Sequence, residues 1–523
     1  MGKTLIVLDT DRVKDYVFTT GNLREIRGAS GLLVQLNERK GENEGKGESE
    51  TDKEGTEEVL EAVVGAELDV VYLAGGSGMV LVPDEKVEAA VQAVQRLYGE
   101  KTANASISAG LLPISEAREP LLDKQFGRLA ALASQALRRA KDEAPPKGKL
   151  PLAPWFRHCA SCGRDPAEEE DSAEEGLFLC RSCATKRRES DRFLFWKDFT
   201  REQKGKWDGA KPAQDFGAIG TLSSPPGYIG FIYADGNAMG EVLKELDSRY
   251  AYGKFSKGVD LLVKEVTYNA LDSLAGGPRE GTAPFEILMV GGDDLMVVTA
   301  ADLALPVALK IAQDFEQKSQ QRTSKHLSLA VGVVLAHDSY PIATMADLSA
   351  ELLASAKKES TRLQAQGGSM GAIDFMVVSE ASSRSLDWVR SEALTDRSFV
   401  FPSIYTCRLT QRPYSLERFA QLYDMALSFK EQGFPQSQLQ NLYDSLFTSF
   451  NTASFSTITA LARLRKGHRQ VLNRFIEQFA LMDPPPWARV ETNAVDTNAD
   501  DKIYSSPLGD LIEMYRFISR PRS

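Results

Sequence analysis

The sequence lacks long apolar runs and a surplus of basic residues, and each absence excludes a class of protein. No run in its 523 residues reaches spanning length, and the apolar stretch after Met1 ends at Asp9. We therefore expect neither a signal peptide nor a membrane segment, and a cytoplasmic location. The net charge of -11 argues against nucleic-acid binding through the overall field, because neutralising phosphates requires clustered Lys and Arg. Any nucleic acid must bind locally or through partner proteins.

Cysteine is also scarce, and four of the five cysteines form two C-x2-C pairs. Cys159, Cys162, Cys180 and Cys183 are separated by seventeen residues between the pairs, and Cys407 stands alone. This spacing is typical of a tetrahedral zinc site, whose binding energy folds a segment with little core of its own. Four unconnected core cysteines are a poor alternative, because the intervening segment is too polar to bury. We expect a structural Zn²⁺, since four thiolates leave no position for water.

Four sequence segments occur twice in the same order: a strand with an acidic end, a hairpin, a second strand and a helix. They lie at 4–12, 70–82, 105–114 and 133–143 in the first copy, and at 229–237, 286–298, 327–336 and 350–360 in the second. The match pairs Asp9 with Asp235 and Lys141 with Lys357. It also places the motif GGSG of the first hairpin opposite GGDD in the second. The repeat predicts two related modules.

Each copy is predicted to be an α+β module in which helices cover one face of a mostly antiparallel sheet. We expect a first module at 1–145, a zinc-binding insert at 146–215, a second module at 216–385 and an all-helical domain at 386–523. The polar tract at 39–58 is too poor in apolar residues to offset the entropy of ordering, so we expect a disordered loop there.

The second hairpin, EILMVGGDDLMVVTA, carries paired carboxylates between two apolar strands. Gly291 and Gly292 allow a tight turn that lifts Asp293 and Asp294 to the rim of the sheet, and Asp235 ends a neighbouring strand. Three carboxylates within a few ångströms need a counter-cation, and oxygen ligands suit Mg²⁺ or Mn²⁺. Such metals bridge nucleotide phosphates, which predicts nucleotidyl transfer. A surface turn would explain a lone GGDD, but the second acidic strand end and the repeat favour a site.

These features together resemble a known family. The motifs YADGNAMG and GGDD, the segment LREIRGASGLL, the tandem modules, the four-cysteine insert and the helical tail resemble the large palm-domain subunit of type III CRISPR interference complexes. That family is the polymerase-cyclase that makes cyclic oligoadenylate, and its palm domains have the ferredoxin-like fold. The resemblance covers nearly the whole chain. It implies ATP as substrate, release of pyrophosphate, a cyclic second messenger, and other type III subunits with guide or target RNA as partners.

Carried over by position, Asp235, Asp293 and Asp294 would be the catalytic, metal-binding residues. Asn237 stands where many family members have a second Asp, and it is not counted as a metal ligand because an amide carries no charge. Lys357 or Lys358 would meet the triphosphate, as lysines do in related GGDEF cyclases. The nucleotide-binding residues implied for this module are Gly236, Asn237, Gly291, Gly292, Lys357 and Lys358.

The first module departs from this pattern, because GGSG lacks both hairpin carboxylates. It keeps Asp9 and Asp11, and we expect it to hold no metal pair. Its expected use is as the acceptor half, which places one ATP so that its 3′ hydroxyl faces the α-phosphate bound at the second module. The nucleotide-binding residues expected there are Asp9, Asp11, Ser30, Gly75 and Gly76.

The chain also departs from family members that begin with an HD-type nuclease domain. The first module starts at residue 4, so we expect no such domain and no DNA cleavage, and His337-Asp338 is read as an incidental dipeptide. The activating ligand, base choice and ring size stay open.

Three alternatives to a subunit that makes cyclic oligoadenylate also stay open. One is a free-standing synthetase, for which a homodimer would be expected. Another is a GGDEF-type enzyme that makes cyclic dinucleotides from GTP or mixed nucleotides, against which the tandem modules and the insert argue. The third is a non-catalytic subunit that binds RNA through the basic, aromatic run at 186–207, a segment that a solvated helix explains equally well.

Overall fold

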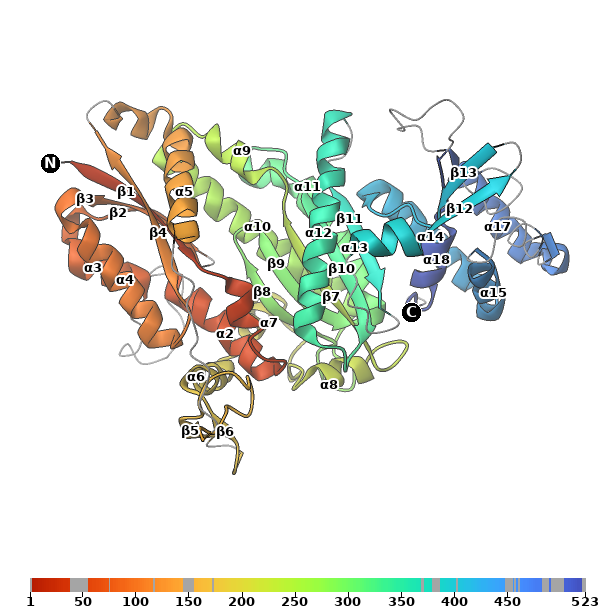
Figure 1. The fold of residues 1–523 in the computed structure, drawn as a ribbon, viewed down its shortest axis with the longest axis horizontal. Coiled ribbons are helices and arrows are strands. Elements are labelled where there is room, and N and C mark those ends of the chain that lie inside the picture. Colours follow the sequence, from red (N-terminus) through yellow and green to blue (C-terminus); the bar gives the residue numbers. More distant parts are fainter. Residues whose placement is uncertain are drawn as a thin grey trace.

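The computed structural model describes most of the chain. The described residues are 2–37, 55–74, 76–115, 118–143, 155–171, 174–367, 371–378, 386–400, 403–446, 455, 458–459, 461–481, 489–490 and 503–519. Figure 1 shows two neighbouring sheets, with the insert below them and the C-terminal part on the right. The α+β class predicted from the sequence is confirmed. Within the described part of the chain, no helix combines the length and the apolar composition needed to span a bilayer.

The first module contains a four-stranded sheet with the order β2-β3-β1-β4, in which all neighbouring strands are antiparallel. A hairpin flanked by crossover helices produces this order, which is that of a ferredoxin-like fold. Its elements are β1 (Lys3–Thr10), α1 (Val13–Val17), α2 (Leu23–Asn37), α3 (Thr56–Val64), β2 (Asp69–Ala74), β3 (Ser77–Pro83), α4 (Val87–Thr102), β4 (Ile107–Ile114) and α5 (Phe126–Glu143).

The disordered loop predicted at 39–58 is wrong at its C-terminal end, where the chain is helical. Helix α3 begins at Thr56, where the Glu58 carboxylate accepts a hydrogen bond from the Gly55 backbone N–H at 3.0 Å. This capping contact satisfies a backbone donor that the helix leaves open. Residues 39–54 of the predicted loop lie outside the described residues.

The second module repeats the strand order of the first and extends it. Its sheet has the order β14-β11-β10-β7-β9-β8, so β10-β7-β9-β8 corresponds to β4-β1-β3-β2. A residue with left-handed backbone conformation follows the first strand at the same position in both copies, Arg12 in the first and Ala238 in the second. The elements are β7 (Tyr228–Gly236), α9 (Met239–Lys244), α10 (Arg249–Ala275), β8 (Phe285–Gly291), β9 (Asp294–Ala300), α11 (Ala301–Thr323), β10 (Leu329–His337), α12 (Ile342–Ala365) and β11 (Ala372–Val377).

Each module packs one long helix against the edge strand of the other module's sheet. Helix α10 of the second packs on β2 of the first, and α2 of the first packs on β8 of the second. At the first contact, Gly253 brings the α10 backbone against the carbonyl oxygen of Val71. At the second, the buried Arg27 guanidinium donates to both carboxylate oxygens of Glu286, at 2.8 and 2.7 Å. These reciprocal contacts bring the two strand edges that carry Asp9 and Asp235 toward each other.

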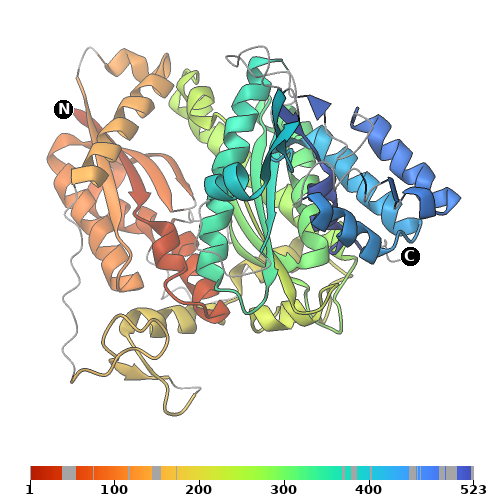
Figure 2. The same ribbon diagram turned by 45° about the vertical axis from the view of Figure 1, so that its right-hand side comes forward.

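The insert joins the modules as a small hairpin followed by helices. It contains β5 (Glu169–Glu170), β6 (Phe178–Leu179), α6 (Arg181–Ser190), α7 (Leu194–Glu202) and α8 (Phe216–Thr221). In Figure 2 the hairpin and α6 lie beneath the first module, next to α2.

The prediction of an all-helical C-terminal domain is wrong. Helices α13 (Leu386–Trp388), α14 (Leu416–Glu431), α15 (Gln436–Leu446), α17 (Lys466–Gln478) and α18 (Leu508–Tyr515) are joined by β12 (Thr395–Val400), β13 (Ser403–Arg408), β15 (Arg489–Val490) and β16 (Ile503–Ser505). These strands form a sheet with the order β12-β13-β16-β15, and β14 (Tyr414–Ser415) completes the sheet of the second module. Helical periodicity dominates the sequence of this region, whereas β16 finds its partner β13 only through a distant pairing.

Candidate active site

The predicted carboxylates lie at one edge of the second sheet. The β7–β9 register pairs Ala234 with Leu295, so the next position places Asp235 beside Asp294. Gly291 pairs with Asp294 and leaves Gly292 and Asp293 as the hairpin turn. Gly292 has a φ of 61°, which favours glycine. The structure therefore places Asp235, Asp293 and Asp294 along the same rim of the sheet.

Asp260 on α10 holds this turn and was missed by the sequence analysis. Its carboxylate accepts a hydrogen bond from the Gly292 N–H at 2.8 Å and contacts the Lys264 ammonium at 2.9 Å. A polar residue on an exposed stripe of an amphipathic helix carries no signal of such a role. Gly236 also contributes by its small size, because a Cβ there would lie 2.8 Å from the Asp293 carboxylate.

The carboxylates carry more negative charge than their surroundings neutralise. Burial, followed by the Asp235 charge, raises the pKa of Asp293 to about 6. Burial and the charges of Asp235 and Asp293 raise the pKa of Asp294 well above its ordinary value. The Lys357 ammonium contacts Asp235 at 2.5 Å. The site thus favours an added cation.

One unpaired carboxylate oxygen indicates whether a divalent metal fits these residues. Asp294 Oδ1 is buried and has no hydrogen-bond partner among the described residues. An unsatisfied carboxylate oxygen beside two other carboxylates matches the oxygen-rich donor set of Mg²⁺ or Mn²⁺. The four cysteines are the one described group with three or more ligand atoms within 4.8 Å of one another. The carboxylates therefore lie along an edge, and their expected convergence on one point is not reached.

The first module repeats the ion pair of the second without the hairpin carboxylates. The Lys141 ammonium contacts Asp9 at 2.6 Å and Asp11 at 3.5 Å, as Lys357 contacts Asp235. Burial is the main cause that raises the pKa of Asp9.

The hairpin registers correct the expected match of GGSG with GGDD by one residue. Ala74 pairs with Ser77 as Gly291 pairs with Asp294, so Ser77 takes the place of Asp294 and Gly76 takes that of Asp293. Gly76 has a φ of 89° and its carbonyl accepts hydrogen bonds from Thr10. Both carboxylates are still absent from this module.

The remaining residues predicted to contact nucleotide differ in their exposure to solvent. Ser30 is buried in α2 at 2% exposure, and its hydroxyl has no partner within the described part of the chain. Gly75 lies outside the described residues. Lys358 is exposed. Nucleotide binding by these residues stays a prediction.

Asn237 and Lys357 line the same cavity. Its amide donates a hydrogen bond to the Ser328 hydroxyl at 2.9 Å, and its N–H donates to the Ser328 carbonyl. The cavity has a volume of about 170 Å³. Its lining residues are Asn237, Ala238, Val242, His326, Leu327, Ser328, Lys357, Ser360, Thr361 and Gln364.

Comparison with protein families identifies this module. Residues 228–365 match the family model of the Cas10/Cmr2 second palm domain. The second module is a Cas10/Cmr2-type palm domain. This stretch contains β7, the GGDD hairpin and Lys357, so the matched residues include the whole carboxylate edge. No curated protein matches the chain.

Two solved structures with TM-scores above 0.5 show the same fold over 99% of the chain. A Csm1–Csm4 cassette in complex with cA4 has a TM-score of 0.53 and 15% identity, covering 99% of this chain and 70% of that one. Csm1 from T. onnurineus has a TM-score of 0.53 and 16% identity, with 99% and 70% covered. A Csm1–Csm4 cassette in complex with cA3 has a TM-score of 0.47 and 15% identity, with 81% and 58% covered. This chain thus spans 58% to 70% of the length of these Csm1-containing structures.

The four cysteines form a second candidate site, below the palm domains. Their sulfur atoms lie within 4.8 Å of one another, and Cys162 and Cys180 are 3.9 Å apart. Sulfur atoms around zinc at about 2.3 Å would be separated by about 3.8 Å, so the cluster fits the ion. His158 is turned to the Gly163 carbonyl, at 3.3 Å. These thiolates would hold Zn²⁺ as a structural ion.

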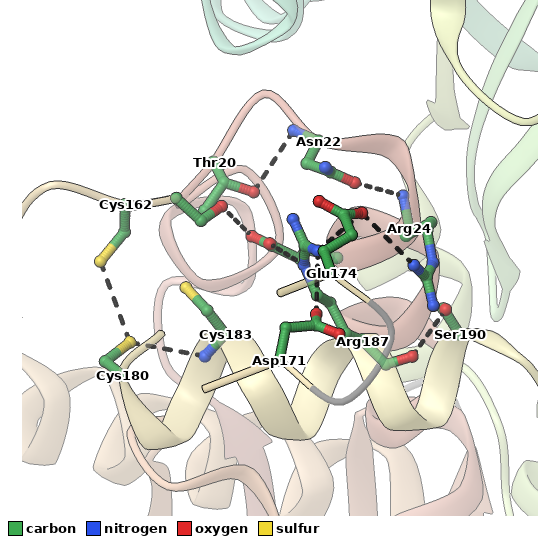
Figure 3. A network of polar contacts seen from close by, with 12 residues as sticks. Thr20, Asn22, Arg24, Cys162, Asp171, Glu174, Cys180, Cys183, Arg187 and Ser190 are labelled. Carbon is green, nitrogen blue, oxygen red and sulfur yellow. Dashed lines mark hydrogen bonds and ion pairs between the residues drawn. The ribbon is translucent and has the colours of Figure 1, made fainter. Parts of the chain in front are cut away.

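A buried network ties the cysteine cluster to α2 (Figure 3). Arg187 follows Cys183 by one helical turn and contacts Glu25 of α2 at 2.8 Å and Asp171 at 2.9 Å. Glu25 also accepts a hydrogen bond from the Ser161 hydroxyl at 2.6 Å. Both carboxylate oxygens of Glu25 accept hydrogen bonds from the insert, which fixes the insert on the first palm module.

The structure does not support the basic, aromatic run at 186–207 as a stacking surface for RNA. Phe195, Phe199 and Trp207 are 5%, 0% and 2% exposed, and the rings of Phe199 and Trp207 pack against Phe285 of β8. Lys186 is also fully buried. Aromatic rings inside a core have no free face for bases, so this run is a structural joint between the insert and the second palm domain. The exposed Arg188 and Lys197 of the same run lie on helical faces that solvent reaches, so part of the run matches the solvated-helix alternative.

Proposed function

We propose that this protein is a metal-dependent nucleotidyltransferase that joins ATP into cyclic oligoadenylate and releases pyrophosphate. The observation that carries the proposal is the half-buried carboxylate edge of Asp235, Asp293 and Asp294, which lies within the Cas10/Cmr2-type palm domain. Its raised pKa values mark carboxylates short of a positive partner. Carboxylates on a solvent-exposed surface turn would not have raised pKa values.

The chain supplies three kinds of group to this reaction. Mg²⁺ or Mn²⁺, when bound, would supply the positive charge that stabilises the phosphates and the departing pyrophosphate. The carboxylates would hold the metal, and Lys357 orients Asp235 while facing the cavity. Asn237 and Ser328 place an amide and a hydroxyl beside Lys357, where they would contact the nucleoside.

The first module is proposed as the acceptor half. Tyr72 of β2 connects the two halves, because its ring stacks on Tyr252 of α10 with centroids 5.8 Å apart. Burial raises the pKa of Tyr72 to about 12, and the charges of Asp9 and Asp293 also raise it. The Asp9 edge and the GGDD hairpin are therefore close enough for both carboxylates to act on one phenol. A nucleotide on the Asp9 side would present its hydroxyl to a second nucleotide at the hairpin.

The proposed setting is a type III CRISPR system, with ATP as substrate and other subunits and guide or target RNA as partners. One structure with this fold is a Csm1–Csm4 cassette in complex with cA4. We extend to this chain both the subunit contact and the kind of product named there.

The proposal is tested by incubating the protein with ATP and Mg²⁺ or Mn²⁺, with target RNA and partner subunits added where needed. Pyrophosphate release and adenylate oligomers are expected. The double variant Asp293→Asn with Asp294→Asn should lose both, because an amide keeps the shape and removes the charge.

Ser77→Ala, at the equivalent hairpin position of the first module, is the matched control and should stay active. A folded double variant with full activity would exclude the second palm site. Preference for GTP over ATP would point to a cyclic dinucleotide synthetase.

A further inference from the structure

Helix α1 of the first module reaches across to the sheet of the second palm domain. The ring of Phe18 packs against Phe231 of β7, with centroids 5.8 Å apart. The Lys14 ammonium lies 4.2 Å from the centre of the Tyr233 ring. Phe231, Tyr233 and Asp235 are alternate residues of one strand, so their side chains share a face of the sheet. Lys14 therefore lies on the face that carries the carboxylate edge.

The Lys14 ammonium has no hydrogen bond or ion pair among the residues that the structure describes, although it is half-buried. Burial lowers its pKa, while the carboxylates of Asp294, Asp347 and Asp235 raise it. It thus differs from Lys357, which is already bonded to Asp235. An ammonium beside the carboxylates without a bonded partner is available to a polyphosphate.

A buried lysine of the four-cysteine insert holds α1 in this place. Lys186 is fully buried, and its ammonium donates a hydrogen bond to the Tyr16 carbonyl at 2.6 Å and lies 4.0 Å from the Tyr16 ring. Lys186 lies three residues after Cys183 on α6. A methyl group on Gly28 would overlap the Lys186 carbonyl oxygen, so α2 and α6 are in backbone contact. The cysteine cluster, α6 and α1 form one connected unit.

The length of α1 explains why it needs this support. It has five residues, and so short a helix has no stability of its own in water. Its position depends on the contacts of Tyr16 with Lys186 and of Phe18 with Phe231. Lys14 lies two residues before Tyr16 on this helix.

We propose that Lys14 is a phosphate-binding residue that the first module contributes to the second palm site, and that Lys186 of the four-cysteine insert positions it. This inference rests on the proposed function and names the part of the nucleotide that Lys14 contacts. It assigns the insert a role in substrate binding in addition to its role in folding.

The test compares binding of ATP with Mg²⁺ and binding of adenosine by calorimetry, using Lys14→Met, Lys14→Arg and Lys186→Met in the full chain. Lys14→Met should weaken ATP binding about tenfold to a hundredfold, the usual effect of losing a charge-assisted hydrogen bond, and leave adenosine binding unchanged. Lys14→Arg should restore most of the affinity. Lys124→Met, at an exposed position of the first module, should match wild type.

The double variant Lys14→Met with Lys186→Met decides the positioning role. If Lys186 acts through Lys14, the double variant should bind ATP no more weakly than Lys14→Met alone. Additive losses would show that Lys186 acts independently and would overturn that part of the proposal.

Two results would overturn the role of Lys14. One is unchanged ATP affinity in Lys14→Met, and the other is an equal loss for adenosine. Wild-type protein that binds no ATP and releases no pyrophosphate would instead refute the proposed function, and this inference with it.

Discussion

Replacing Asp293 by Asn should stabilise the metal-free protein at neutral pH while it removes a metal ligand. The folded state raises the pKa of Asp293 from 3.8 to about 6, so between these values the folded protein holds the proton more tightly than the unfolded chain. The free energy of unfolding therefore falls as the pH rises through this window. An amide does not ionise and does not incur this loss.

The size of the effect follows from the pKa shift. A change from 3.8 to about 6 corresponds to roughly 3 kcal/mol, at about 1.4 kcal/mol per pKa unit. Asp235 and Asp294 share the repulsion and still remain in the variant, which reduces the expected gain to about 1 to 3 kcal/mol. The gain should be complete above pH 6 and absent below pH 4.

Thermal unfolding between pH 4 and pH 8 measures this difference. The buffer should be freed of divalent ions on a resin, because a soluble chelator would also remove zinc from the cysteines. Adding Mn²⁺ should stabilise the wild type, by about 2.7 kcal/mol at a hundredfold excess over Kd, and the variant much less. The exposed Asp387→Asn is the control. A variant less stable than wild type at pH 7, or a gain that persists at pH 4, would refute the reasoning.

Three further predictions concern the supports of the site. Elemental analysis should find about one zinc per chain, and Cys180→Ser should lower solubility or thermal stability; well-folded protein without zinc would contradict this. Arg27→Met should cost about 3 to 5 kcal/mol of stability in denaturant, because it leaves the buried Glu286 unpaired, and adding Glu286→Met should restore most of it. A bulky residue at Gly76 should reduce two ATP sites to one in calorimetry, since its φ of 89° and its contact with Thr10 leave no room. If wild type binds a single ATP, the first module is scaffold, and activity should rise steeply with protein concentration.

The sequence alone was sufficient for features that depend on neighbouring residues. The acidic ends of β1 and β7 follow from short apolar strands, and the cysteine pairs follow from their spacing. Comparing the two copies also matched Asp9 with Asp235 and Lys141 with Lys357, and the structure shows the same Lys–Asp ion pair in both copies, which the sequence comparison did not predict. A duplicated module allows this because a contact in one copy constrains the same positions in the other.

Features that depend on distant pairings were decided only by the tertiary structure. The offset that places Ser77 opposite Asp9 comes from hairpin register, which the motif letters GGSG and GGDD do not encode. The C-terminal sheet needs β16 to reach β13 across almost a hundred residues. Lys14 lies in the first module and acts beside Tyr233 of the second, so no local pattern identifies it. Burial of Lys186 likewise follows from packing of α6 on the first module, which no local pattern identifies.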